Sequence, residues 1–177
     1  MKILAFGGST SSSSINRRLA NYAAGQVPGA DVTDLDLRQF ALPIYSVDEQ
    51  DENGIPAAAH AFRDAILAHD ALVVSLAEHN GSYAAAFKNL YDWTSRIEKS
   101  VWADRPMLLL STSPGGRGGA TVLAAAEATF PRMGARLAAS FSLPSFGQNF
   151  DDAKGIVDPS LASAFNEAVQ AFVDQLA

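Results

Sequence analysis

The stretch KILAFGGSTSSSSINRRLA at residues 2–20 predicts a strand, then a loop of glycine and hydroxyl residues, then the start of an amphipathic helix. Gly7 and Gly8 let the backbone turn sharply off the strand. A helix N-terminus has unpaired N–H groups and partial positive charge, so an anion can bind there without a dedicated lysine. Serine tracts are usually flexible linkers, but this one lies between a strand and a helix. We therefore expect an anion site with donors from Ser9 to Ser14 and Asn16.

Composition limits the possible functions. The chain has 177 residues, 48% of them apolar, which suits a single domain over residues 1–177. The net charge is −6 and no basic run is longer than Arg17-Arg18, which argues against a nucleic-acid partner. There is no cysteine and there are only three histidines, so we expect no disulfide, thiol redox centre or metal site, and any redox chemistry needs a bound cofactor. Without a signal-peptide pattern or a long apolar run, we expect a cytoplasmic protein with no membrane partner.

Apolar runs and helical patterns alternate along the chain. Runs near 70–77 and 105–112 are continuously apolar, as in central parallel strands covered on both faces. The alternation predicts an α/β, doubly wound open sheet, in which ligands bind beyond the carboxyl ends of the strands. The stretch from Arg38 to Pro56 is expected to be an irregular surface excursion. The expected strands lie near 2–7, 31–36, 70–77, 105–112 and 136–142, and the expected helices near 15–25, 57–69, 84–98, 120–131 and 159–176.

Two further loops should lie at the same sheet edge as the serine loop. EHNGSY at 78–83 follows the third strand, and STSPGGRGG at 111–119 follows the fourth. Four glycines within positions 115–119 would bring backbone amides near a flat or anionic group, whereas an ordinary turn needs only one or two glycines. The nucleotide P-loop motif is absent, and so is the complete dinucleotide fingerprint, for which Asp34 or Asp36 would be the acidic residue.

Three motifs occur in order: GSTSSSSIN at 8–16, EHNGS at 78–82 followed by the FKN and DW of residues 87–93, and SPGGRGG at 113–119. Together they resemble the G-S-x-R-x-x-S-x-N, P-E-Y-N-x-S, L-K-N-x-x-D-W and S-P-G-x-x-G-G motifs of the NAD(P)H-dependent FMN reductases, which include quinone, azo-dye and chromate reductases. The resemblance spans nearly the whole chain. It implies a flavodoxin-like, five-stranded parallel sheet of order 2-1-3-4-5 with helices on both faces.

The chain departs from this family's pattern at four positions. Ser11 stands where the family has an arginine, Ala77 and Ala84 where it has prolines, and His79 where it has a tyrosine. Loss of the arginine removes a bidentate phosphate donor, for which Arg17 or Arg117 is a candidate replacement.

The resemblance implies FMN as cofactor and NADPH or NADH as co-substrate. It also implies ping-pong transfer of hydride from nicotinamide C4 to flavin N5 and on to a quinone, flavin, azo compound or similar small acceptor. The flavin carries the chemistry, so no catalytic side chain is expected, and by analogy the protein is a homodimer or homotetramer. The expected cofactor-binding residues are Ser9, Ser11, Ser14, Ile15, Asn16, Glu78, His79, Asn80, Gly81, Ser82, Ser113, Pro114, Gly115, Gly116, Gly118 and Gly119.

Two alternatives remain open on the sequence. One is a flavodoxin-like carrier that passes single electrons to proteins, and the other is a binding module of the same fold that has lost its flavin. Other aromatic and histidine residues receive simpler interpretations. Trp93 is expected in the core or at a subunit interface, His60 and His69 in solvent, and Tyr83 against the flavin ring, while Tyr45 could reach a neighbouring subunit.

Overall fold

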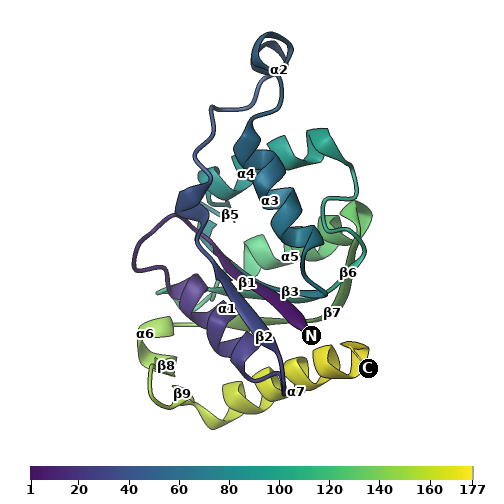
Figure 1. The fold of residues 1–177 in the computed structure, drawn as a ribbon. Helices are drawn as coiled ribbons and strands as arrows, with labels where there is room; N and C mark the ends of the chain where they lie inside the picture. The colour runs from purple at the N-terminus through teal and green to yellow at the C-terminus, as the bar shows by residue number, and fades with distance from the viewer. Residues whose placement is uncertain (177) are drawn as a thin grey trace.

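A five-stranded parallel sheet forms the centre of the computed structural model, which describes residues 1–176 (Figure 1). The spatial order β2-β1-β3-β6-β7 is the predicted 2-1-3-4-5 order of flavodoxin-like sheets, because β6 and β7 are the fourth and fifth strands of this sheet along the chain. All neighbouring pairs are parallel. The strands are β1 (Lys2–Gly8), β2 (Asp31–Leu35), β3 (Ala71–Leu76), β6 (Arg105–Thr112) and β7 (Ala135–Leu143).

Helices cover both faces of the sheet (Figure 1). One face carries α3 (Ala57–Leu67), α4 (Ala85–Ile97) and α5 (Ala120–Thr129), and the other carries α1 (Ile15–Gly25) and α7 (Pro159–Leu176). Alternate residues of β1 serve the two layers: Leu4 and Phe6 join the first core, while Ile3 and Ala5 join the second. The continuously apolar pattern of the central strands therefore reflects burial on both faces, as predicted.

The registers align the carboxyl ends of the three central strands. Gly8 of β1 lies beside Leu76 of β3, which lies beside Ser111 of β6. The loops that follow these strands consequently begin at one edge of the sheet. Gly7 is required at this edge because a Cβ there would lie 2.3 Å from the amide nitrogen of Arg17 on α1.

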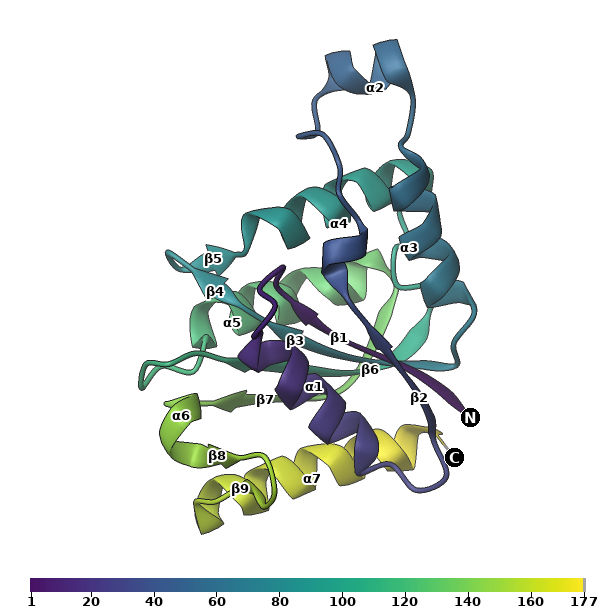
Figure 2. The same ribbon diagram turned by 60° about the vertical axis from the view of Figure 1, so that its left-hand side comes forward.

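The excursion expected from Arg38 to Pro56 contains regular structure that the sequence interpretation missed. A 3-10 helix spans Leu37–Gln39, and α2 (Val47–Asn53) stands on an arm that projects from the body of the molecule (Figure 2). The Ser46 side chain accepts a hydrogen bond from the Glu49 N–H, which is half of a Ser-x-x-Glu capping box, so the signal for this helix was present. None of the α2 residues is buried.

The remaining short elements lie in the connections that follow β3, α5 and β7. Two small hairpins form, β4 (Glu78–His79) with β5 (Ser82–Tyr83), and β8 (Phe150–Asp151) with β9 (Gly155–Ile156). A 3-10 helix at Phe130–Met133 continues α5, and a short helix, α6 (Phe146–Asn149), follows β7. The predicted helix near 120–131 therefore ends its α-helical part at Thr129, just before Pro131.

Candidate functional site

A cleft of about 300 Å³, which we call the cofactor cleft, opens where the three predicted loops meet. Nine of the predicted residues line it: Ser9, Ser11, Ser14, Ile15, Asn16, Glu78, His79, Ser113 and Pro114. The lining also includes Ser13, Ala77 and Thr112, which are not among the expected cofactor-binding residues although each adjoins one of them. The other seven lie farther along the same loops and are absent from the lining: Asn80, Gly81, Ser82, Gly115, Gly116, Gly118 and Gly119.

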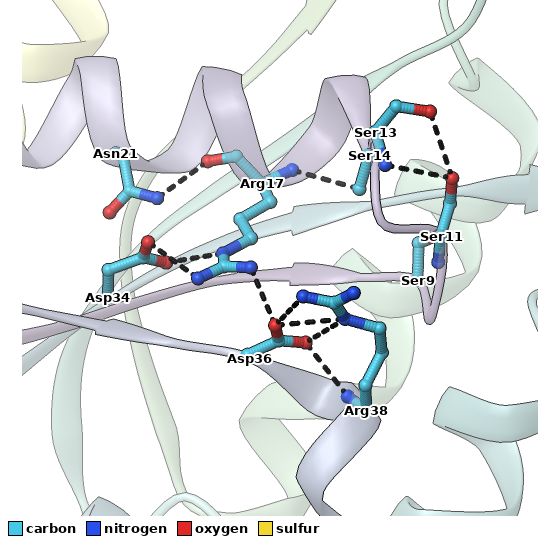
Figure 3. A network of polar contacts seen from close by, with 9 residues as sticks. All are labelled: Ser9, Ser11, Ser13, Ser14, Arg17, Asn21, Asp34, Asp36 and Arg38. Atoms are coloured by element: carbon cyan, nitrogen blue, oxygen red, sulfur yellow. Dashed lines mark hydrogen bonds and ion pairs between the residues drawn. The ribbon is translucent and has the colours of Figure 1, made fainter.

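The serine loop is folded by its own side chains. Ser9 Oγ accepts from the Ser11 N–H at 3.1 Å, and Ser11 Oγ accepts from the Ser13 N–H at 3.3 Å (Figure 3). Ser14 caps α1 by accepting from the Arg17 N–H at 3.1 Å. The first backbone bond of this helix runs from the Arg18 N–H to the Ser14 carbonyl, so the amides of Ile15 and Asn16 precede it and can donate to an anion.

The Asn16 side chain has a structural task. It is only 3% exposed, and its Oδ1 accepts from Ser75 Oγ at 2.7 Å and from the Thr112 N–H at 3.0 Å. Its Nδ2 donates to the Thr112 carbonyl at 3.1 Å. The side-chain amide therefore joins α1 to β3 and β6, while the backbone N–H of Asn16 at the helix start can donate to a ligand.

Arg17 does not replace the arginine that this chain lacks at Ser11. Its guanidinium donates to Asp34 at 2.7 and 2.8 Å and to Asp36 at 2.8 Å, along β2 and its C-terminal extension (Figure 3). Side-chain hydrogen bonds from Arg38 hold the pKa of Asp36 well below its ordinary value of 3.8, aided by the Arg38 N–H and the charge of Arg17. The two aspartates considered for a dinucleotide fingerprint thus serve as partners of arginines.

The 78–83 segment is a two-residue hairpin attached to α5. Glu78 Oε2 accepts from the N–H groups of Thr121 at 2.9 Å and Val122 at 3.0 Å, so the carboxylate caps the helix N-terminus while the residue also lines the cleft. Asn80 and Gly81 have φ values of 53° and 76°, as a type I′ turn requires. The turn alone therefore accounts for the Asn-Gly pair.

The expectation that Tyr83 lies against a flavin ring is not supported. Its ring packs on Phe87 and Phe130, with centroid distances of 5.7 and 6.2 Å, and its hydroxyl lies 3.3 Å from Thr129 Oγ1. Burial raises the pKa of its phenol. Tyr83 belongs to the aromatic cluster between α4 and α5 and does not line the cofactor cleft.

The glycines at 115–119 divide into two groups. Gly118 and Gly119 have φ values of 59° and 77°, and a Cβ on Gly118 would lie 2.4 Å from Ser142 Oγ and 2.9 Å from the Leu143 carbonyl carbon, so the fold requires them. A Cβ on Gly116 would meet nothing within 4 Å, and one on Gly115 would meet only Ser113 Oγ at 3.9 Å. Packing within the chain therefore does not explain the presence of glycine at 115 and 116.

The sequence interpretation also covered two histidines, Trp93 and Tyr45, none of which lines the cleft. His69 is buried, with its ring nitrogens 2.7 Å from the Ala65 carbonyl and 2.8 Å from Thr33 Oγ1, so the expectation that it is solvated was wrong, whereas His60 is exposed. Trp93 is fully buried and donates to the Pro43 carbonyl at 2.8 Å, which makes it a core residue. Tyr45 packs edge-on against Trp93 of its own chain, with a centroid distance of 5.0 Å.

Among residues 1–176, no helix is long and apolar enough to cross a membrane. The same part of the chain contains no cluster of three or more histidine, cysteine, aspartate or glutamate side chains able to hold a metal ion.

Comparisons with known proteins agree with the geometry. Residues 1–148 match the family model of NADPH-dependent FMN reductases. A probable NADPH:quinone oxidoreductase of Oryza sativa is 35% identical over 124 residues, which cover 67% of this chain and 61% of that protein. An NAD(P)H-dependent FMN reductase of Pseudomonas aeruginosa is 34% identical over 116 residues, which cover 65% of this chain and 61% of that protein. The chain thus aligns with about three fifths of the length of these curated relatives.

A solved structure shares the whole fold. The flavoenzyme NAD(P)H:(acceptor) oxidoreductase FerB from Paracoccus denitrificans superimposes with a TM-score of 0.76 at 24% identity, over 99% of this chain and 96% of that one.

Proposed function

Because the chain belongs to the NADPH-dependent FMN reductase family, we propose that it is an NAD(P)H-dependent oxidoreductase that binds FMN in the cofactor cleft and reduces a quinone or a similar flat acceptor. The observation that carries the proposal is the serine loop with the α1 N-terminus, which faces the same cleft as the anchored hairpin and the Ser113–Pro114 turn. Related proteins named NADPH:quinone oxidoreductase and FMN reductase support this choice of acceptor and cofactor.

The donor chemistry of the cleft fits FMN. Ser9, Ser11 and Ser14 supply hydroxyl groups, and the amides of Ile15 and Asn16 supply N–H groups at the positive end of a helix, which together suit a phosphate monoester. The open space beside Gly115 and Gly116 suits a flat ring lying on the backbone. The phosphate would be held by neutral donors, because Arg17 is committed to Asp34 and Asp36 and neither Arg17 nor Arg117 lines the cofactor cleft.

When bound, FMN supplies the chemistry that takes a hydride from a nicotinamide and passes electrons to a second substrate. The protein contributes position and electrostatics. Gly118 and Ala120 donate their N–H groups within the loop, so we assign the amides of Gly115 and Gly116 to the ring edge that gains electron density. Glu78 keeps the hairpin and α5 together and thereby fixes the spacing between the two ring-binding walls. No side chain is assigned an obligatory proton transfer.

We also propose a homodimer or homotetramer of single-domain subunits that works in the cytoplasm. The support is the arm, where Ile44 and Val47 are 78% and 63% exposed and no residue of α2 is buried. Light scattering coupled to size exclusion tests the assembly, and an Ile44→Asp, Val47→Asp double variant should shift it to monomers. Cell fractionation tests the location.

The activity is tested by an anaerobic visible spectrum of the protein with one equivalent of FMN, before and after NADPH or NADH. Bleaching of the flavin band, followed by its return on addition of 1,4-benzoquinone, would support the reductase. Parallel double-reciprocal plots against the two substrates would support the ping-pong order. Binding without bleaching by either nucleotide would instead indicate an electron carrier, and absence of flavin binding would contradict the proposal.

A further inference from the structure

A second cleft lies on the other side of the serine loop. This space, which we call the α1 cleft, has a volume of about 450 Å³ and is larger than the cofactor cleft. Both clefts share Ser13 and Ser14, so these two serines form a common wall. The α1 cleft is lined by Ser12, Ser13, Ser14, Arg17, Arg18, Asn21, Tyr22, Phe150 and Asp152.

One face of α1 forms the first wall of this cleft. Ser14, Arg17, Arg18, Asn21 and Tyr22 recur at the three- and four-residue intervals that place side chains on one helix face. Figure 3 shows three of them, Ser14, Arg17 and Asn21, in a row along the helix. This wall therefore runs directly from the predicted phosphate site along the helix.

The opposite wall consists of Phe150 and Asp152 from the β8–β9 hairpin. Arg18 donates to Asp152 at 2.5 and 3.1 Å while its guanidinium lies over Phe146 and Phe150, 4.9 and 5.6 Å from the ring centroids. The Tyr22 ring meets Phe150 edge-on with a centroid distance of 5.3 Å. Two arginines and the aromatic residues Tyr22 and Phe150 thus line the same cleft, a combination suited to a phosphate followed by a purine.

We propose that the α1 cleft holds the adenylate half of FAD, so that this chain accepts FAD as well as FMN. The inference rests on the proposed function, because it needs the flavin phosphate at the shared serines. FAD differs from FMN only by an adenosine monophosphate joined to that phosphate. An adenosine monophosphate joined to a phosphate at Ser14, and directed away from the flavin ring, would enter the α1 cleft. Its phosphate meets Arg18, and its adenine meets Tyr22 and Phe150.

The adenylate of a nicotinamide nucleotide is a weaker match to this cleft. The residues assigned to the flavin ring, from Glu78 and His79 to Ser113 and Pro114, line only the cofactor cleft. A nicotinamide must reach that ring to deliver its hydride, so its approach is from the cofactor cleft and not from the far side of the phosphate.

The ion pair between Arg18 and Asp152 allows two substitutions with opposite expected effects. Arg18 attracts a second phosphate, whereas the carboxylate of Asp152 both repels it and occupies the arginine. Asp152 has a side chain that is 78% exposed, so replacing it leaves the core intact. Arg18→Gln should therefore lower the ratio of FAD to FMN affinity, and Asp152→Ala should raise it, each by about three- to ten-fold.

Isothermal titration of flavin-free protein with FMN and with FAD measures this ratio without any need for turnover. We expect FAD to bind at least as tightly as FMN, with the two opposite shifts in the variants and no shift in the control Asp174→Ala, which removes the same charge from an exposed site on α7. FAD affinity more than ten-fold below that of FMN, or a ratio that neither variant changes, would overturn the adenylate site. Failure of FMN itself to bind would overturn the proposed function instead. If Asp152→Ala changes the KM for NADPH but leaves the ratio of FAD to FMN affinity constant, the α1 cleft binds the co-substrate and the FAD assignment is refuted.

Discussion

Asn16→Ala should destabilise the cofactor-free protein, because this side chain is a structural joint between α1 and the sheet. The substitution removes three buried hydrogen bonds, to Ser75 Oγ at 2.7 Å, to the Thr112 N–H at 3.0 Å and to the Thr112 carbonyl at 3.1 Å. Each hydrogen bond contributes about 1 kcal/mol and the partner residues are buried, so the free energy of unfolding should fall by about 3 kcal/mol. For a chain of this length that loss lowers Tm by about 6–12 °C.

Urea denaturation of flavin-free protein, followed by far-UV circular dichroism, measures this loss as a lower midpoint at an unchanged slope. The matched control is Asn21→Ala on the same helix, where a partly exposed side chain makes one bond to the Arg17 carbonyl at 3.0 Å and the expected loss is under about 1 kcal/mol. If Asn16→Ala unfolds within about 0.5 kcal/mol of the parent but loses FMN affinity, Asn16 is a phosphate ligand and the structural reasoning is refuted.

Three further perturbations test the loops and the arginine network. Glu78→Ala leaves the Thr121 and Val122 amides uncapped and should cost about 2 kcal/mol, or about 4–8 °C in Tm by calorimetry. Gly118→Ala should be strongly destabilising because of its positive φ and the contact with Ser142, whereas Gly116→Ala should unfold like the parent while weakening FMN binding measured by fluorescence. Folding lowers the pKa of Asp36, so the ionised carboxylate stabilises the fold above the ordinary pKa of 3.8, and this stabilisation is lost as the pH falls below that value. In urea titrations, the loss of stability caused by Asp36→Asn should therefore be full at pH 7 and become smaller below pH 4.

Each of these expectations has a contrary result. If Glu78→Ala has the same Tm as the control Glu167→Ala at an exposed position, the cap on α5 contributes nothing to stability. Equal stability of the Gly116 and Gly118 variants would remove the distinction between glycines that the fold requires and glycines that a ligand requires. A deficit of Asp36→Asn that is constant from pH 7 to pH 3 would show that this carboxylate is not stabilised by its arginines.

The sheet was predictable because the central strands β3 and β6 are continuously apolar and helices such as α7 are amphipathic, and both patterns follow directly from burial. The α2 helix was missed because it buries none of its residues, and only the Ser46-x-x-Glu49 capping signal marked it. The polar side chains that the fold itself uses were harder to predict. Asn16 and Glu78 belong to ligand-like motifs, yet their side chains bond to backbone amides far along the chain, to Thr112 and to Thr121, and no local pattern encodes such partners.

The roles of Tyr83, His69 and Arg17 depended in the same way on tertiary neighbours. An aromatic residue in a ligand loop can turn toward the ligand or toward the core, and here Phe87 and Phe130 provide the larger apolar contact. The ring nitrogens of His69 bond to Thr33 of β2 and to the Ala65 carbonyl, and Arg17 pairs with Asp34 and Asp36. The position where the three loops meet could be predicted from the sequence. Loops that follow the carboxyl ends of neighbouring parallel strands come together at one edge of the sheet, whatever their side chains contact.

The most direct test of a phosphate site at the serine loop is a parallel titration of flavin-free protein with FMN and with riboflavin, which differs by that phosphate alone. We predict that FMN binds at least ten-fold more tightly, because the hydroxyls of Ser9, Ser11 and Ser14 and the first amides of α1 have an anion to bind only in FMN. Equal affinity for the two flavins, or binding of neither, would contradict the assignment of this loop.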